Sequence, residues 1–166
     1  MPRLLNATAP LFKRLVIALL LALPCIANTQ AAEEGLAVIV HPGTAVDSLT
    51  EEQVSRIFRA EQQFWPDNTR ITLLIRAPVS QGRTMALEKI YQMSEQGFRK
   101  YWISKMFKAE VASGPRVMYS TGMAASLVTA VPGAILLVPS SNIPDNAKVL
   151  KIDGKLPGEE GYIYSM

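Results

Sequence analysis

A loop spanning residues 76–84 contains two arginines and two hydroxyl residues, side-chain types that bind small oxyanions. Arginine presents a fixed fork of N–H donors, and serine or threonine adds a rotatable hydroxyl. The candidate ligand-binding residues of this loop are Arg76, Ser80, Gln81, Gly82 and Arg83. Arginines near turns are often simply solvated, so residue type alone leaves the role of the loop open.

The elements around this loop would aim its donors in one direction. Residues 71–75 are β-branched and apolar and predict a buried strand, whereas apolar residues at Ala86, Leu87, Ile90 and Tyr91 predict a helix of about three turns. A strand-loop-helix junction places free N–H groups and the positive end of the helix dipole above the strand. Such a junction is suited to an anion.

A second junction of the same kind follows. Residues 117–119 predict a short strand that leads into Ser120 and Thr121, two further candidate ligand-binding residues. The helix after them has a buried stripe of Ala124, Leu127, Val128 and Val131, and Pro132-Gly133 ends it.

Alternating strands and helices predict an α/β domain with a mostly parallel sheet and helices on both faces. Further strands are expected at residues 36–40, 134–138 and 149–152, and the first two are apolar throughout, as in a strand buried on both faces. In such sheets ligands bind beyond the carboxyl ends of the strands, where both junctions would lie.

Two more helices have clear start signals. Thr50 and Gln53 form a capping box for a helix that should end near Phe58. Ser94 is expected to cap a helix with an apolar stripe and a basic face. The residues of that stripe are Phe98, Tyr101, Trp102 and Met106, and those of the basic face are Arg99, Lys100, Lys105 and Lys108. We expect Phe64 and Trp65 to anchor a loop rather than form a ligand cage.

The N-terminal segment, residues 1–32, has the pattern of a cleaved signal peptide. Three basic residues precede an apolar run at 15–23, which is short for a membrane span, and Ala31 and Ala32 suit a peptidase. A retained membrane anchor is the alternative. Residues 33–166 are then expected to form a single periplasmic domain.

Removal of this segment changes the charge. The chain has 17 basic and 14 acidic residues, and the segment contains three of the basic ones and none of the acidic ones. The remaining domain is neutral, which argues against nucleic acid as a partner. Cys25 leaves with the segment, so no disulfide or thiolate site is expected.

Enzymatic and metal chemistry are not expected. His41 is the only histidine, it lies beside a Pro-Gly turn, and no second metal-binding residue accompanies it at a typical spacing. We therefore expect no metal, no cofactor and no catalytic residue.

The order of motifs resembles phosphate ABC transporter substrate-binding proteins, which have the type 2 periplasmic-binding-protein fold. The segments that carry the resemblance are 49–58, Trp65-Pro66-Asp67, the strand ending in Arg76, Pro132-Gly133-Ala134-Ile135 and 149–154 with Pro157. The resemblance implies phosphate held by an arginine and a Ser-Gly-Thr turn, here Arg76 and Ser80. Two features depart from the family: Gln81-Gly82 replaces Gly-Thr, and the chain has the length of one lobe only.

Our leading hypothesis is a secreted, non-enzymatic phosphate-binding domain linked to phosphate uptake or sensing, with a transporter, a sensor or a second lobe-supplying protein as partner. The alternative is an envelope interaction module that keeps the fold without tight ligand binding. We expect Arg76→Ala to weaken binding more than Arg83→Ala, because Arg83 should turn outward to water. We also expect poor discrimination of phosphate from sulfate. The loop lacks a carboxylate, and the sequence does not show where the loops that contain Asp47 and Asp67 lie.

Overall fold

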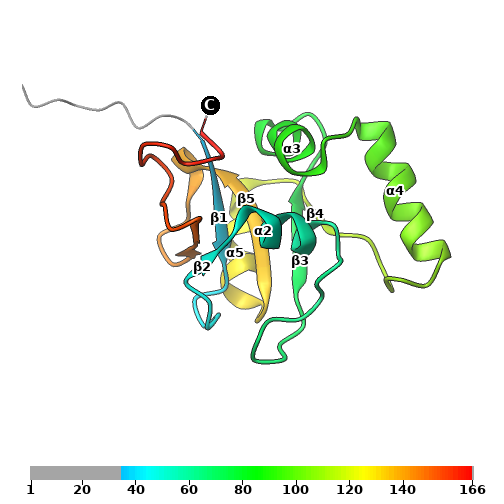
Figure 1. Cartoon of the computed structure of the whole chain (residues 1–166), viewed down its shortest axis with the longest axis horizontal. Coiled ribbons are helices and arrows are strands. Elements are labelled where there is room, and N and C mark those ends of the chain that lie inside the picture. The colour runs from blue at the N-terminus through cyan, green and yellow to red at the C-terminus, as the bar shows by residue number, and fades with distance from the viewer. Residues whose placement is uncertain (1–34, 166) are drawn as a thin grey trace, which may run out of the picture. The chain divides into compact units, whose positions relative to one another are not determined.

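The computed structural model describes residues 35–165, so the predicted signal segment and Cys25 lie outside the described part of the chain. The first elements along the chain are β1 (Leu36–Val40), β2 (Ser48–Leu49), α2 (Glu51–Phe58), β3 (Thr72–Arg76), α3 (Gln81–Ala86), the π-helical turn η1 (Leu87–Tyr91) and α4 (Glu95–Phe107). They are followed by β4 (Arg116–Met118), α5 (Thr121–Ala130), β5 (Ala134–Pro139), the short 3₁₀ turn η2 (Ser140–Asn142), β6 (Lys148–Val149) and β7 (Lys151–Ile152), as labelled in Figure 1 where there is room.

Five strands form the main sheet, in the order β4-β3-β5-β1-β6. β3 is parallel to β4 and β5, whereas β1 is antiparallel to both β5 and β6. Four of the five strands therefore share one direction, and the predicted mostly parallel sheet is confirmed. β2 and β7 form a separate parallel pair.

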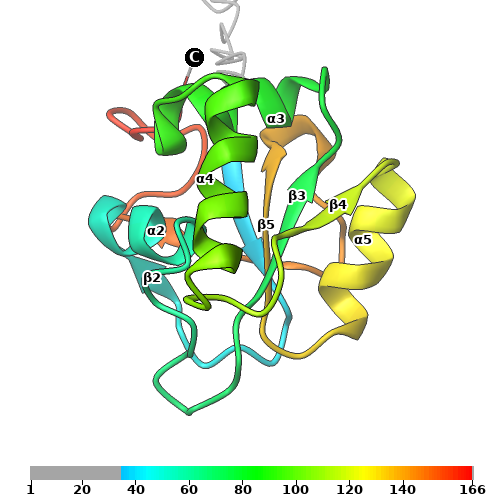
Figure 2. The same cartoon turned by 90° about the vertical axis from the view of Figure 1, so that its right-hand side faces the viewer.

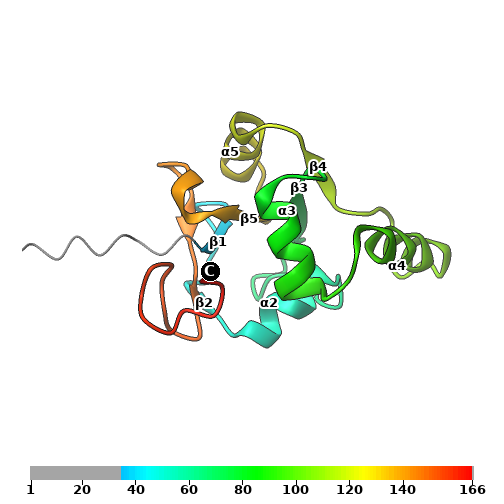
Figure 3. The ribbon, with the colours of Figure 1, turned by 90° about the horizontal axis from the view of Figure 1, so that it is seen from above.

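The sheet is buried on both faces, which explains the unbroken apolar run of β1. Leu36, Val38 and Val40 pack in a core with α2, α3 and α4, whereas Ala37 and Ile39 pack in a second core with α5. Figure 3 shows α2 and α5 on opposite sides of the sheet. The prediction of helices on both faces is confirmed.

The predicted helix starts are formed as expected. The N–H of Gln53 donates to Thr50 Oγ1 at 3.2 Å, and the N–H of Thr50 donates to Gln53 Oε1 at 2.8 Å, so the capping box closes and α2 runs to Phe58. Ser94 Oγ accepts from Gly97 N at 3.1 Å and caps α4.

Two sequence predictions were partly wrong. Phe98 and Trp102 are buried in α4, but Met106, in the last turn of the helix, is 41% exposed because it lies outside both core clusters. The predicted strand 149–152 is divided at Leu150: β6 pairs with β1, and β7 pairs with β2. An apolar run cannot reveal that neighbouring residues pair with different strands.

The remaining expectations concern loops. Trp65 is buried and donates from Nε1 to Gly133 O at 3.1 Å, so it anchors its loop, whereas Phe64 is half exposed. His41 Nδ1 accepts from Gly43 N at 3.0 Å within its own turn. Within residues 35–165, no cluster of three metal-binding side chains is found, and each helix is too short or too polar to cross a bilayer.

Candidate functional site

The two strand-loop-helix junctions lie side by side at one edge of the sheet. Arg76 pairs with Met118 in the parallel register of β3 and β4, so the two strands end together. Beyond β3, the N–H of Ala77 still donates to Met118 O at 2.9 Å. α3 and α5 both begin at this edge, which is uppermost in Figure 2. We call it the carboxyl edge.

Arg76 is the last residue of β3, and its side chain is partly buried. Its Nη1 atom is buried and has no hydrogen-bond partner among the described residues. The side chain lies against the first turn of α3, because a Cβ on Gly82 would be 3.4 Å from Arg76 Cγ. A buried, unpaired N–H costs about 1–3 kcal/mol, and more on a charged group. An anion that accepted this hydrogen bond would offset that cost.

Ser80 is the N-cap of α3. Its Oγ accepts from Arg83 N at 3.3 Å and donates to Ala77 O at 2.7 Å. The hydroxyl must release Ala77 O before it can donate to a ligand. Gly82 is buried against the end of β5, where a Cβ would lie 3.5 Å from Pro139 Cδ.

Gln81 and Thr121 are the exposed first residues of α3 and α5. Ser120 is the N-cap of α5, and its Oγ accepts from Met123 N at 3.1 Å. A Cβ on Gly122 would meet no atom within 4 Å, so the start of α5 is open to solvent. The first-turn N–H groups of both helices, with the positive ends of their dipoles, face the carboxyl edge.

Arg83 does not turn outward to water, and that expectation was wrong. Its side chain is 4% exposed and forms an ion pair with Glu95. The guanidinium also lies over the ring of Phe98, with Cζ 3.8 Å from the ring centroid. Arg83 therefore packs beneath the start of α4, away from solvent, and its first role is structural.

The two candidate carboxylates lie at the opposite edge, where β3 and β5 begin. Asp47 pairs with Lys148, which is in register with the end of β1, and this pairing lowers the pKa of Asp47 from its ordinary value. Asp67 precedes β3 and accepts from Thr69 N at 2.9 Å. Neither carboxylate is placed with Arg76.

Exposed apolar residues beside the carboxyl edge were missed from the sequence. Val79 is 98% exposed, Tyr119 is 74% exposed and Met123 is 42% exposed. Val79 also has φ +70°, a left-handed conformation that is costly for a β-branched residue. We call these three residues the apolar rim. The signal in the sequence was Val79, a bulky apolar residue in an otherwise polar loop, which could have pointed to an exposed apolar surface.

No protein-family model matches the chain. Several solved structures do match in fold. One, from Clostridium perfringens, is described as a phosphate ABC transporter substrate-binding protein with bound phosphate; it is 21% identical, with a TM-score of 0.60 over 75% of this chain and 47% of that one. An ABC-type phosphate transport receptor from Vibrio cholerae is 18% identical, with a TM-score of 0.60 over 75% of this chain and 48% of that one. PstS from Borrelia burgdorferi is 16% identical, with a TM-score of 0.58 over 75% of this chain and 49% of that one.

The chain shares their fold. It spans about half the length of these proteins, with coverage of 47%, 48% and 49%. The resemblance seen in the sequence is therefore confirmed for the fold, and the coverage agrees with the length of one lobe.

Proposed function

We propose that this domain is a non-enzymatic binding protein that holds phosphate at the carboxyl edge and serves phosphate uptake or sensing. The observation that carries the proposal is the Arg76 guanidinium, which has a buried and unpaired Nη1 beside the first turn of α3. The bound phosphate of the Clostridium perfringens structure supports the choice of oxyanion.

The chemistry of the edge suits a small tetrahedral anion. Arg76 supplies charge-assisted hydrogen bonds, and the N–H groups at the starts of α3 and α5 supply neutral donors with a favourable dipole. Ser80 adds a hydroxyl once it rotates away from Ala77 O. The donors come from two helices on adjacent strands, so they approach the anion from two directions.

The geometry supports binding rather than catalysis. His41 is held in its own turn at the edge where β5 begins, and its backbone N–H donates to Ala134 O at 3.1 Å. It is therefore at the other end of the sheet from Ser80, and a Ser-His pair would need both at one end.

The site is open on the side that faces solvent. The chain covers only about half of each matching structure, and the exposed apolar rim lies beside the donors in the chain. We propose that a partner, a membrane transporter, a sensor or a second protein, covers this edge during uptake or sensing.

Titration calorimetry with inorganic phosphate tests the proposal. We expect Arg76→Gln to weaken binding by about 1.5–3 kcal/mol, because one charge-assisted partner is lost. Arg116→Gln is the matched control, because this exposed arginine begins β4 at the other end of the strand, and it should leave phosphate affinity within twofold. Absence of heat with millimolar phosphate, or equal effects of the two substitutions, would refute the proposal.

A second function is favoured by the apolar rim. Three exposed apolar side chains at a polar edge are typical of a protein-binding surface, so the domain would act as an envelope interaction module with little ligand affinity. A partner from the periplasm that binds wild type and Arg76→Gln equally well, but not Tyr119→Ser, would support this function over phosphate binding.

Export is also a proposal. The basic and apolar pattern of residues 1–32 supports a signal peptide and a periplasmic location for residues 33–166. Intact-mass measurement of protein from a periplasmic extract should show a chain that begins near Ala32 or Glu33. A mass that includes residues 1–31 would contradict it.

A further inference from the structure

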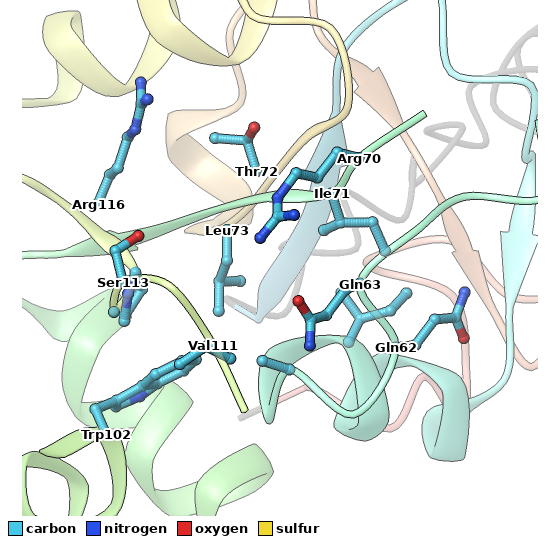
Figure 4. Close-up of a pocket in the computed structure, with 14 residues that line it drawn as sticks. Gln62, Gln63, Arg70, Ile71, Thr72, Leu73, Trp102, Val111, Ser113 and Arg116 are labelled. Carbon is cyan, nitrogen blue, oxygen red and sulfur yellow. The ribbon is translucent and has the colours of Figure 1, made fainter. Parts of the chain in front are cut away.

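A cavity of about 220 Å³ lies at the other end of the sheet, on the face covered by α2 and α4. Its walls come from the end of α2, the segment before β3, the first part of β3, α4 and the loop that precedes β4 (Figure 4). The volume is several times the roughly 30 Å³ that one water molecule occupies in the liquid. The cavity is therefore large enough for a small organic molecule.

One side of the cavity is a closed turn of the chain. The N–H of Ile71 donates to Gln63 O at 2.9 Å, and the N–H of Trp65 donates to Thr69 O at 2.8 Å. Trp65 in turn donates to Gly133 O, which fixes the turn to the start of β5. Gln63 and Arg70 both line the cavity from this rigid turn.

The cavity has polar groups on more than one wall. Gln63 Nε2 donates to Glu110 O at 3.0 Å, which ties the turn to the loop after α4 and leaves the Gln63 side-chain oxygen as an acceptor. Arg70 points its guanidinium into the cavity in Figure 4, between Leu73 and Gln63. Ser113 adds a hydroxyl from the facing wall.

The charge of Arg70 has no carboxylate beside it. The three ion pairs found among residues 35–165 belong to Arg83, Lys105 and Lys148, and no Asp or Glu lines the cavity. Arg70 lies instead near the ring of Phe64, with Cζ 5.8 Å from the ring centroid. Arg70 is exposed, and a cation without a carboxylate beside it favours an anion.

Part of the lining is apolar. Leu73, Val111 and the ring of Trp102 form a wall beside the Arg70 guanidinium. Inorganic phosphate would leave this apolar surface uncovered, whereas a ligand with an apolar body would remove it from water.

We propose that this cavity is a second binding site, for a small organic anion in which one carboxylate or phosphate group meets Arg70 and an apolar body covers Leu73, Val111 and Trp102. Arg70 precedes β3 and Arg76 ends it, so the two sites lie at opposite ends of one strand and bind their ligands independently.

Nuclear magnetic resonance with benzoate and phenyl phosphate as probes tests the site. The chain has two tryptophans, and only Trp102 lines the cavity, so the indole N–H signal of Trp65 is an internal control. Both probes should shift the Trp102 signal in a saturable manner and leave that of Trp65 almost unchanged. Benzyl alcohol, which lacks the charge, should bind at least fivefold more weakly.

Substitutions at Arg70 and at an arginine outside the cavity sharpen the test. Arg70→Gln should weaken benzoate binding at least fivefold, and Arg70→Lys should restore part of the loss. Arg56→Gln is the control, because Arg56 is exposed on α2 and is not among the residues that line the cavity, and the benzoate affinity of this variant should stay within twofold of wild type.

Three results would overturn the second site. They are the absence of a saturable Trp102 shift with both anions, equal binding of benzyl alcohol, and equal losses in Arg70→Gln and Arg56→Gln. Independence of the two sites is tested with both ligands present. Addition of saturating phosphate should leave the benzoate affinity within twofold of its value without phosphate. A protein that bound benzoate but not phosphate would refute the proposed function and support this site.

Discussion

The guanidinium of Arg83 binds the carboxylate of Glu95 through two hydrogen bonds, Nε to Oε2 at 3.0 Å and Nη2 to Oε1 at 2.9 Å. This bidentate pair joins the first turn of α3 to the first turn of α4, so it connects the candidate phosphate site to the helix that follows. Ser80, the N-cap of α3, and Ser94, the N-cap of α4, each stand at the start of one of the two helices that the pair joins.

Loss of this pair should destabilise the fold. We expect Arg83→Ala to lower the free energy of unfolding by about 2–3 kcal/mol, because a paired, buried cation and its contact with Phe98 are removed and Glu95 loses its partner. Urea denaturation measures the effect. Lys100→Ala, on the exposed face of α4, is the control and should change the free energy by less than about 0.5 kcal/mol. Equal stabilities would contradict the structural role of Arg83.

The same pair predicts a pH dependence. The hydrogen bonds from Arg83 lower the pKa of Glu95 from its ordinary value. The stabilisation by Glu95 is therefore fully present above its unfolded pKa of about 4.3 and is lost as the pH falls through the lowered folded pKa. The difference in unfolding free energy between wild type and Glu95→Gln should be constant from pH 7 to 5 and should shrink below that range. If the difference in unfolding free energy instead increased as the pH fell, the lowered pKa of Glu95 would be contradicted.

Phosphate and sulfate should compete at the carboxyl edge. Hydrogen phosphate carries a proton that an acceptor can recognise, but residues 76–84 contain no Asp or Glu, and Asp47 and Asp67 are at the other edge. We expect the isolated protein to bind phosphate with a Kd of roughly tens of micromolar to millimolar and sulfate within about tenfold of that value. Competition calorimetry measures the ratio. Tight binding by a monomer that rejects sulfate would contradict the prediction.

Val79 should be replaceable with a gain in stability. Its left-handed backbone costs about 1–2 kcal/mol in an L-residue, and its exposed side chain contributes little burial. We expect Val79→Gly to raise the free energy of unfolding by about 0.5–1 kcal/mol, since glycine adopts this conformation freely but loses more entropy on folding. Thermal unfolding measures the gain. Val79→Ala keeps the Cβ, so it should gain less, and equal gains would show that the backbone strain is not the cause.

Much of the fold could be predicted from local patterns. The capping box at Thr50 and Gln53 fixed the start of α2, and the apolar run of residues 36–40 identified β1 with its bounds. The antiparallel direction of β1 could not be predicted, because an apolar run on a doubly buried strand reads the same in both directions.

The site could be predicted only in part. The junctions at Ser80 and Ser120 were identified because hydroxyl caps have a local signature, and the structure places them at one edge. The burial of Arg83 depends on Glu95, twelve positions later, which no pattern within the loop reveals. The cavity lined by Gln63 and Arg70 was missed for the same reason, since its walls come from separate segments.

The place of β1 in the sheet governs when the domain can fold. Among residues 35–165, β1 pairs only with β5 and β6. Leu36 also exchanges hydrogen bonds with the last segment: its N–H donates to Tyr164 O at 2.9 Å, and Tyr162 Oη donates to its carbonyl at 2.8 Å. The first described strand therefore has no partner until almost the whole chain has left the ribosome. Sheets closed by such long-range contacts form slowly. If the chain is secreted, this delay leaves it unfolded long enough to pass through the export channel, and we expect its apolar strands to need a chaperone during that interval.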